Sequence, residues 1–511
     1  MNKQYYITTP IYYVNDKPHI GHAYTSLACD IIARFKRLDG YQVKFLTGTD
    51  EHGQKVEKSA KKKRIKPQDF TDQVSQSFRD LINTMNFSPD DFIRTTEERH
   101  KLAASHFWKT LYNNGYIYKG EYSGWYSIRD ESFYTENELV DGKAPTGAEV
   151  EWFEEETYFF KLSKFQDKLL NFYKNNPDFI APKSRMNEVI SFVQGGKKYQ
   201  SGNLSDISIS RTSFSWGIPV PDDNTHIMYV WLDALTNYLS ALNYPDINNQ
   251  LYKDFWPADL HIVGKDILRF HAVYWPAFLM AADLPLPNRI FAHGWWTNEG
   301  EKISKSIGNV IDPNNLIQKF GVDQIRYFLM KHIVFGNDGN YSQQEVIRHI
   351  NSDLANNIGN LVQRVLTMIQ KNFQGKIPNN DNLLDNDLKL LSSGYNLLPE
   401  LQILIDQQNY NLYLEKVISL SSLANEYINT EAPWTLKKDN PQRMSNILYS
   451  LSETIRVIAI YLLPFMPDSA KKILDLLSVS PKQQNFQYIS KNHALKTGSI
   501  LPIPTVIFPK R

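Results

Sequence analysis

Apolar residues near the start of the chain follow two different spacings. Residues 4–8 form a short run with Tyr and Ile that predicts a strand, and residues 43–46 predict a second strand. Between them, residues 21–38 carry apolar side chains three and four positions apart, which is the spacing of one buried helix face. These positions are Ala23, Leu27, Ile31, Phe35 and Leu38. A strand, a helix and a strand in this order predict a right-handed crossover and the beginning of a parallel sheet.

The alternation of strand and helix is interrupted in the middle of the chain and then returns. Between residues 116 and 228, aromatic and acidic residues alternate without a clear order of helices and strands, which predicts an insertion. The strand-helix pattern resumes at 228–233, at 260–266 and at 289–294. From about residue 346 onward, the apolar residues follow helical spacing throughout.

These patterns predict an α/β fold in which a parallel-sheet domain is split by an inserted domain and followed by an all-α helical bundle. The predicted regions are 1–115 for the first half of the sheet domain, 116–228 for the insertion, 229–345 for the second half and 346–511 for the bundle. A length of 511 residues agrees with several domains, because typical domains have about 100–200 residues.

Composition and charge narrow the possible classes of protein. Hydrophobic residues make up 42% and charged residues 22% of the chain, as in ordinary globular proteins. The formal net charge is +1, so an RNA partner would have to meet a local basic surface rather than a polycationic chain. Cys29 is the single cysteine, which excludes a disulfide within the chain and a cysteine-based zinc site.

The first string that indicates chemistry is Pro-His-Ile-Gly-His at residues 18–22, at the mouth of the first predicted helix. His19 and His22 are three positions apart and therefore share a helix face. A helix N-terminus offers free N–H groups and a positive dipole end, which suit a phosphate. Gly21 lets a nucleotide approach the backbone closely, and the imidazoles can donate hydrogen bonds as charge builds on the phosphate oxygens. Taken alone, the string predicts a pair of capping histidines equally well.

The second string is Lys-Ile-Ser-Lys-Ser at residues 302–306. Lys302 and Lys305 can reach a pyrophosphate as point charges, and Ser304 adds a hydroxyl donor. Taken alone, such a string is more often a solvated lysine loop. Because both strings occur in one chain, they favour two halves of a single site for the phosphates of ATP.

Together, the two strings resemble the two signature sequences of class I aminoacyl-tRNA synthetases. Ile303 stands where the second signature usually has Met, which has a similar apolar volume. Further strings extend the resemblance over essentially the whole chain to the methionyl-tRNA synthetase family. They are residues 10–15, 49–53, 216–221, 229–234 and 292–295. The resemblance implies a Rossmann-type catalytic domain, a connective insertion that is too short for a separate hydrolytic domain, and an anticodon-binding helical bundle.

The resemblance also implies an activity and its residues. The expected reaction is ATP-dependent ligation of L-methionine to tRNA(Met), initiator tRNA included, through methionyl-adenylate, with release of AMP and diphosphate. ATP with Mg2+ is the expected cofactor. The expected catalytic residues are His19, His22, Lys302 and Lys305. The expected ATP-binding residues are His19, Gly21, His22, Gly264, Asp266, Lys302, Ser304 and Lys305.

A candidate methionine pocket follows from strand ends and from the resemblance. Asp50 comes after a predicted strand, where open α/β sheets bind ligands, and its carboxylate can hold an ammonium group. A turn or N-cap role for Asp50 is the alternative. Aromatic faces suit a thioether, which gains about 0.3–1.5 kcal/mol from each contact, although each aromatic alone is more often core. The family's remaining pocket positions match Ile11, Tyr13, Trp231, Ala234, Tyr238 and His293.

The helical region carries candidate tRNA contacts. Asn356, Asn360 and Arg364 step by four along one helix face and match the family's anticodon-reading helix. Pro433 and Trp434 match a second segment, where the Trp stacks on an unpaired base for about 1–3 kcal/mol. Without the resemblance, Asn360 would be an exposed polar residue and Trp434 a core residue.

Four expectations concern metal, assembly, location and alternatives. The family often holds zinc in the insertion, but residues 116–225 contain neither Cys nor His, so we expect no structural zinc and no metal ligand. We expect a monomer, because the chain stops soon after the helical region. We expect no membrane association and a bacterial cytoplasmic location, with the mitochondrial matrix as the alternative. Another class I synthetase, a small-molecule nucleotidylyltransferase and an inactive tRNA-binding paralogue remain alternative functions.

Overall fold

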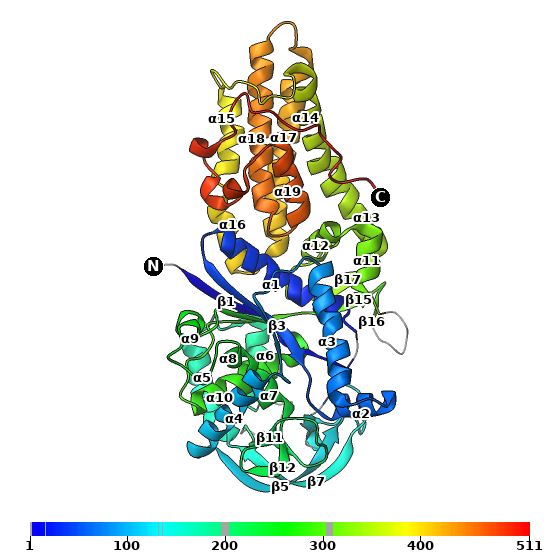
Figure 1. The fold of residues 1–511 in the computed structure, drawn as a ribbon, viewed down its shortest axis with the longest axis vertical. Coiled ribbons are helices and arrows are strands. Elements are labelled where there is room, and N and C mark those ends of the chain that lie inside the picture. The colour runs from blue at the N-terminus through cyan, green and yellow to red at the C-terminus, as the bar shows by residue number, and fades with distance from the viewer. Residues whose placement is uncertain (1–2, 16, 131, 135, 196–203, 303–309) are drawn as a thin grey trace.

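Seven parallel strands form one sheet in the described part of the molecule, which is a computed structural model (Figure 1). The described residues are 3–15, 17–130, 132–134, 136–195, 204–302 and 310–511. The strands are β1 (Gln4–Thr8), β2 (Tyr12–Tyr13), β3 (Gln42–Asp50), β4 (Asp91–Arg94), β8 (Ile180–Ala181), β13 (Leu260–Gly264) and β14 (Ile290–His293). Their order is β2–β3–β1–β13–β14–β8, and β4 also pairs with β3. The strands predicted at 4–8 and 43–46 are therefore confirmed, as are those within 260–266 and 289–294.

Helix α1 (Ile20–Leu38) confirms the first predicted crossover. It packs across β1, β3 and β13, and the apolar positions predicted for its buried face are buried, except Leu38, which is half-buried. Lys36 and Arg37 lie in its last turn, where positive charge suits the helix dipole. Because β1 pairs in parallel with β3 on one side and with β13 on the other, α1 begins beside the carboxyl ends of central strands.

The region predicted as an insertion contains antiparallel strands, which lie at the end of the molecule opposite the C-terminal helices (Figure 1). One sheet has the order β6–β5–β7–β9 and another the order β10–β12–β11. The bounds are β5 (Ile117–Ser127), β6 (Ser132–Tyr134), β7 (Glu151–Phe160), β9 (Ile207–Ser208), β10 (Ser210–Arg211), β11 (Pro219–Val220) and β12 (Asp223–Met228). β8 lies within 116–228 as well, although it belongs to the parallel sheet. The bounds of the four regions stay a prediction.

The strand-helix unit predicted at 228–233 does not belong to the parallel sheet, so this prediction is wrong. β12 ends at Met228 and pairs antiparallel with β10 and β11, and helix α7 (Val230–Leu235) follows almost at once. The reason is that a short apolar run fits a buried helix as well as a buried strand.

Further helices surround the parallel sheet, and a small sheet leads out of it. The helices are α2 (Gln54–Lys63), α3 (Pro67–Thr84), α4 (Glu98–Asn113), α5 (Gln166–Asn175), α6 (Lys183–Val193), α8 (Asn237–Ser240), α9 (Gln250–Phe255), the π-helix η4 (Phe270–Tyr274) and α10 (Trp275–Ala281). The small sheet contains β15 (Trp296–Asn298), β16 (Glu301–Lys302) and β17 (Gly339–Tyr341).

The C-terminal part is helical, as predicted, and forms the other end of the molecule (Figure 1). Its helices are α13 (Gln343–His349), the π-helix η5 (Ile350–Gly359), α14 (Asn360–Asn372), α15 (Asp385–Tyr395), α16 (Leu398–Asp406), α17 (Tyr410–Glu431), the short turn η6 (Pro433–Thr435), α18 (Pro441–Leu462) and α19 (Pro467–Leu476). Two more helices, α11 (Pro313–Phe320) and α12 (Val322–Lys331), come before them within the predicted second half of the sheet domain. No helix in the described ranges combines the length and the apolar character that crossing a membrane requires.

The helical bundle shares a hydrophobic core with one face of the parallel sheet. Buried residues of α1 and β1 belong to the same apolar cluster as buried residues of α17 and α18. The Tyr410 hydroxyl in α17 donates to the Ala28 carbonyl in α1 at 3.0 Å. The ring centroids of Phe35 and Tyr413 lie 5.9 Å apart with the rings edge to face. The bundle is therefore packed directly on the helix whose N-terminus carries His19 and His22.

A buried ion pair reinforces this junction. Arg326 of α12 donates to the Asp30 carboxylate of α1 at 2.7 Å, and both side chains are fully buried. The same guanidinium donates to the carbonyls of Phe465, Pro464 and Met85. Burial alone would raise the pKa of Asp30, but Arg326 and Arg34 beside it lower this pKa below its usual value. The pair therefore joins the sheet domain, α12 and the end of the bundle at one point.

We expect Arg326→Met to lower the free energy of unfolding by about 3–5 kcal/mol, because it leaves the Asp30 carboxylate buried without its main partner. Urea unfolding followed by tryptophan fluorescence measures the loss. The matched control is Arg34→Met, because Arg34 also pairs with Asp30 but keeps 20% of its side chain exposed, so a smaller loss is expected. Adding Asp30→Leu to Arg326→Met should recover part of the loss, and no recovery would contradict the account.

Candidate active site

A cavity of about 1820 Å³ lies at the carboxyl ends of the parallel strands. The residues that follow β1 line it, as do the last residues of β3, β13 and β14, namely Asp50, Gly264 and His293. Ligands of open α/β sheets bind at this edge. Typical small-molecule pockets measure about 300–1,000 Å³, so the cavity has room for more than one small substrate.

The predicted ATP- and methionine-binding residues whose side chains the structure describes line this one cavity. They are Ile11, Tyr13, His19, Gly21, His22, Asp50, Trp231, Ala234, Tyr238, Gly264, Asp266 and His293. They come from stretches of the chain up to about 280 positions apart, so the fold gathers them as the resemblance implied. Their individual roles stay predictions.

The two histidines of the first signature cap the N-terminus of α1. His19 is the N-cap residue, and its Nδ1 accepts the Gly21 N–H at 3.1 Å, while Nδ1 of His22 accepts the His19 N–H at 3.1 Å. The capping alternative raised by the sequence is therefore correct as a description of these contacts. It does not exclude a ligand, because both rings also line the cavity, with their centroids 3.9 Å apart.

The capping contacts fix which ring nitrogen can donate. Since both Nδ1 atoms accept backbone N–H groups, the proton of each neutral ring lies on Nε2. Nε2 can then act as a hydrogen-bond donor toward phosphate oxygens. A Cβ atom at Gly21 would lie 2.9 Å from Cε1 of His19, closer than a normal contact, so glycine at this position lets the His19 ring fold back onto the helix.

Asp50 and Tyr13 are neighbours on paired strands. Tyr13 of β2 lies opposite Asp50 of β3 in the parallel register, and Asp50 is 8% exposed. The Lys55 ammonium lies 5.0 Å from the centroid of the Tyr13 ring and also lines the cavity. A nearly buried carboxylate at the edge of a cavity is suited to a compact cationic group such as the ammonium of an amino acid.

The aromatic part of the cavity is held in place by residues that the sequence did not reveal. Trp231 stacks on Phe270 with centroids 3.7 Å apart and an interplanar angle of 6°. The Tyr238 hydroxyl donates to Nε2 of His271 at 2.8 Å, and Nδ1 of His271 donates to the Ile267 carbonyl at 3.0 Å. Burial lowers the pKa of His271 to about 4, so this ring is neutral near pH 7.

His293 is also fixed by two hydrogen bonds. Its Nδ1 donates to the Gly294 carbonyl at 2.8 Å, which leaves Nε2 to accept the Thr25 hydroxyl at 2.7 Å. Burial lowers its pKa, so it too is neutral near pH 7. Thr25 lies one turn into α1 and therefore links the first signature to the aromatic wall, by which we mean Trp231, Tyr238 and His293. The wall is therefore uncharged and rigid, which suits a polarizable apolar side chain.

A buried carboxylate holds α7, which bears Trp231 and Ala234. Asp233 lies 2.7 Å from Nδ1 of His52 and 2.7 Å from Nε2 of His100. Burial would raise the pKa of Asp233, but His52 and His100 lower it to about 2. His52 follows β3 directly and His100 belongs to α4, so this bridge ties α7 to the strand that ends in Asp50.

The strand that leads to the second signature begins beside the cavity. β14 ends in His293 and leads through β15 to β16, and Trp296 and Thr297 of β15 line the cavity. Lys302 is the last residue of β16, whereas Ser304 and Lys305 lie outside the described residues. The nearby Lys265 pairs with Asp338 at 2.7 Å, and its ammonium group lies over the Trp295 ring.

Gly264 and Asp266 form the turn after β13. Oδ1 of Asp266 accepts the indole N–H of Trp295 at 3.1 Å. A Cβ atom at Gly264 would lie 2.5 Å from this same Oδ1, so glycine gives the Asp266 carboxylate its space. This turn presents a carboxylate to the cavity.

The predicted anticodon residues gather on the bundle. Asn356 of η5 and Asn360 at the start of α14 are exposed. The Arg364 guanidinium lies 5.6 Å from the centroid of the Trp434 ring and donates to Asn429 Oδ1 at 2.9 Å. Trp434 is 50% exposed, so the alternative of a core Trp is wrong. Pro433, just before it, is buried.

Comparison with known proteins identifies the class and then the family. A family model described as tRNA synthetases class I (M) matches residues 5–151 and 146–366. The fold is that of a class I aminoacyl-tRNA synthetase. A second model, described as the anticodon binding domain of methionyl tRNA ligase, matches residues 377–511. The chain belongs to the methionyl-tRNA synthetase family.

Individual relatives are similar to this chain over its full length. The methionine–tRNA ligase of Rickettsia bellii is 59% identical, covering 100% of this chain and 99% of the relative. That of Brucella suis is 50% identical, covering 99% of this chain and 98% of the relative. The solved Mycobacterium tuberculosis methionyl-tRNA synthetase in complex with methionyl-adenylate has a TM-score of 0.95 at 49% identity, covering 99% of this chain and 100% of that one.

These comparisons confirm the predicted fold class and the predicted enzyme, a methionine–tRNA ligase. They also confirm ATP, L-methionine and tRNA as its substrates. A small-molecule nucleotidylyltransferase does not carry a methionyl tRNA ligase anticodon domain, so that alternative is excluded.

Proposed function

We propose that the cavity at the strand ends is where this chain joins L-methionine to AMP before transferring it to tRNA(Met). The observation that carries the proposal is the convergence, on one cavity, of the histidine-capped N-terminus of α1, the Asp50 carboxylate and the aromatic wall around Trp231. The helix N-terminus supplies donors for phosphate. Asp50 supplies a partner for an ammonium group, and the aromatic wall supplies a surface for a thioether.

In the first step, a methionine carboxylate oxygen attacks the α-phosphorus of ATP, and the bond to the departing diphosphate breaks. Negative charge builds on the phosphate oxygens during this exchange. The Nε2 donors of His19 and His22 and the positive end of the α1 dipole are proposed to stabilise that charge. Lys302 and Lys305 are proposed to meet the diphosphate from the loop that follows β16. Much of the rate comes from holding the carboxylate and the phosphate in line.

In the second step, a ribose hydroxyl of the terminal adenosine of tRNA attacks the carbonyl of the adenylate, and AMP leaves. Class I membership favours the 2′-hydroxyl. Asp50 holds the ammonium group and the wall holds the side chain, so the carbonyl stays in place between the two steps. His271 and Phe270 act as positioning residues for Tyr238 and Trp231.

Mg2+ is proposed to arrive with ATP. This cation keeps several waters and binds substrate phosphates together with one or two carboxylates, rather than an all-protein cage. Asp266 fits that requirement, because it is exposed and lines the cavity. Bound Mg2+ would supply charge neutralisation on the phosphates.

The exposed residues on the bundle are proposed to bind the anticodon of tRNA(Met), initiator tRNA included. Trp434 offers a ring on which an unpaired base can stack, and Arg364 beside it can contact base edges or phosphate. Asn356 and Asn360 add amide groups on the same helical run.

We expect Trp434→Ala to raise KM for tRNA in aminoacylation by about 5- to 150-fold, because one stacked base is worth about 1–3 kcal/mol. Methionine-dependent pyrophosphate exchange should stay unchanged, since that half-reaction needs no tRNA. The matched control is Trp152→Ala, which removes another exposed Trp at the opposite end of the molecule. Equal damage to exchange and to aminoacylation by Trp434→Ala would contradict the anticodon role.

A cytoplasmic location and a monomeric state remain proposals. Light scattering of the purified chain tests whether it is a monomer. The reaction itself is tested by pyrophosphate exchange with methionine, isoleucine, norleucine and cysteine, followed by aminoacylation of tRNA(Met). Methionine should give the highest kcat/KM. Exchange with a different preferred amino acid would favour another class I specificity, and absence of exchange would favour the inactive paralogue.

A further inference from the structure

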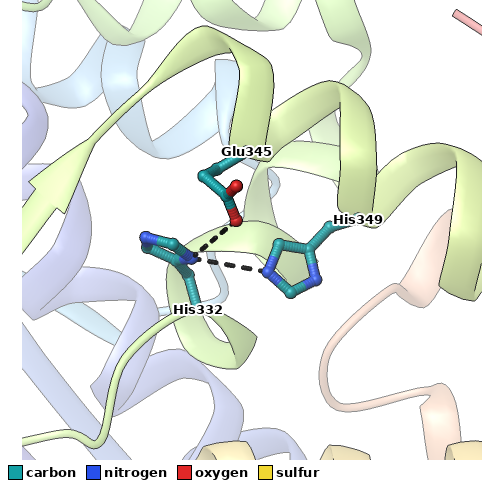
Figure 2. Close-up of side chains that lie close together, drawn as sticks. All are labelled: His332, Glu345 and His349. Atoms are coloured by element: carbon teal, nitrogen blue, oxygen red, sulfur yellow. Dashed lines mark hydrogen bonds and ion pairs between the residues drawn. The ribbon is translucent and has the colours of Figure 1, made fainter. Parts of the chain in front are cut away.

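Two histidines and a glutamate converge outside the cavity, where the sheet domain meets the helical part (Figure 2). His332 follows α12, and Glu345 and His349 lie in the first and last turns of α13. Nδ1 of His332 is 3.4 Å from Nε2 of His349 and 3.9 Å from Oε2 of Glu345. One ligand atom of each residue lies within 4.8 Å of the other two.

The outer contacts of the two rings orient them toward each other. Nδ1 of His349 donates to the Asp353 carboxylate at 2.9 Å, and this carboxylate also accepts the Tyr327 hydroxyl at 2.9 Å. The His332 ring hydrogen-bonds to the backbone of Asn340. A metal-binding histidine typically donates its other ring N–H to a carboxylate or a carbonyl, which fixes the tautomer and raises its basicity as a ligand.

Aromatic packing limits the rotation of both rings. The His332 ring stacks on Phe328 with centroids 4.9 Å apart, and the His349 ring meets Phe328 edge to face at 6.0 Å. His349 keeps 7% of its side chain exposed and His332 keeps 20%. The two imidazoles are therefore held on a rigid surface, while Glu345, with 37% of its side chain exposed, can move toward them.

The positively charged side chain of Arg348 lies beside Glu345 and His349. The Arg348 guanidinium donates to Glu345 Oε2 at 2.6 Å and to Nε2 of His349 at 3.0 Å. Its side chain is 54% exposed, so it can turn into solvent without leaving a buried charge. Arg348 therefore competes with any metal ion for the same two ligand atoms.

We propose that His332, Glu345 and His349 bind a divalent transition metal of the zinc class, which displaces the Arg348 guanidinium. Zinc–nitrogen bonds of about 2.0–2.1 Å place two tetrahedral ligands about 3.3 Å apart, close to the separation of the two ring nitrogens. Two imidazoles and one carboxylate suit zinc, cobalt, nickel or iron, with an open position for water. The Glu345 oxygen lies 3.9 Å from the His332 nitrogen and within 4.8 Å of the His349 nitrogen, so its side chain has to move closer to both rings to bind the same ion.

The site is separate from the zinc position expected of the family. The expectation of no metal came from the lack of Cys and His in residues 116–225, and this cluster lies elsewhere in the chain. A metal here would clamp the end of α12 to α13, which continues into the helical run that carries Asn356 and Asn360. Its proposed effect is on the stability of this junction, since none of the three ligands lines the cavity.

The test is a titration of the untagged, chelator-treated full chain with Co2+, followed by visible absorption and by competition with Zn2+. One Co2+ per chain is expected to bind at the cluster, and Zn2+ is expected to displace it. Arg348→Ala should tighten binding by about 10-fold, because a like charge beside the ion is removed. His332→Ala in the Arg348→Ala background should abolish the Co2+ absorption.

His493→Ala is the matched control, because His493 is exposed and lies far along the chain from the cluster. It should leave Co2+ binding unchanged. If His332→Ala unfolds the chain, the comparison of the wild type with Arg348→Ala still decides, since Arg348 is mostly exposed. The proposal is overturned if Arg348→Ala binds Co2+ no more tightly than the wild type, or if His493→Ala loses as much binding as His332→Ala.

Discussion

Replacing His22 by alanine is expected to lower kcat for methionine-dependent pyrophosphate exchange by about 100- to 1,000-fold, the usual cost of losing one donor to a developing oxyanion. The Kd for methionine should stay nearly unchanged, because Asp50 and the aromatic wall lie on other elements. Exchange kinetics measure the first quantity, and equilibrium binding without ATP measures the second.

The same substitution also removes a helix cap, so a second variant must separate the two roles. His22→Glu restores the capping contact, since a carboxylate three residues after the N-cap can accept its N–H. The thermal stability of His22→Glu should therefore return toward that of the wild type. Its exchange activity should fall at least as far as that of His22→Ala, because a carboxylate repels phosphate. If His22→Glu restores activity along with stability, His22 acts only as a cap.

Asp50→Asn is expected to raise KM for methionine by about 10- to 150-fold, because a hydrogen bond to a charged group is worth about 1.5–3 kcal/mol. The substitution keeps the shape of the side chain and removes the charge that faces the ammonium group. KM for ATP should change little. Pyrophosphate exchange at varied methionine and at varied ATP measures both constants.

Asp266→Asn is the matched control for Asp50→Asn, because it neutralises another carboxylate of the same cavity. It should leave KM for methionine unchanged. It should instead change how the rate of pyrophosphate exchange depends on the concentrations of ATP and Mg2+. A rise in both substrate constants by the same factor in Asp50→Asn would show a general disturbance of the cavity and would contradict a specific contact with the ammonium group.

The parts of the site that the sequence predicted are those encoded over short distances. The turn at His19–His22 is a strand end, a helix start and two histidines within a few residues, so its capping geometry follows from local spacing. Asp50 is the last residue of β3, a strand that the apolar run at 43–46 predicted in part. The proposal that Asn356, Asn360 and Arg364 contact the anticodon came from the resemblance and from their step of four, and it stays a prediction.

The parts that the sequence did not predict depend on contacts between distant segments. Phe270 and His271 lie in a π-helix, and only the fold shows that they support Trp231 and Tyr238. The same holds for Asp233, whose two histidine partners come from other elements more than a hundred positions away. No local spacing in the sequence predicts such contacts, because each residue taken alone resembles an ordinary core residue.

The wrong strand at 228–233 has a related cause. Tyr229 to Leu232 is an apolar run of strand-like composition, yet it forms a short helix after an antiparallel strand. Contacts with distant residues favour the helix over a strand in this run, since the bridge from Asp233 to His52 and His100 holds α7 against the core. The edge strand β8 was missed because two residues are too few to form a pattern.

One cavity is proposed to hold both halves of a methionyl-adenylate, which a crystal structure with a non-hydrolysable sulfamoyl analogue of that compound can test. We expect the ammonium group about 3 Å from the Asp50 carboxylate, the thioether against Trp231 and Tyr238, and the sulfamoyl group at the N-terminus of α1. An analogue bound elsewhere, or bound with its ammonium group turned away from Asp50, would rule out this assignment of the cavity.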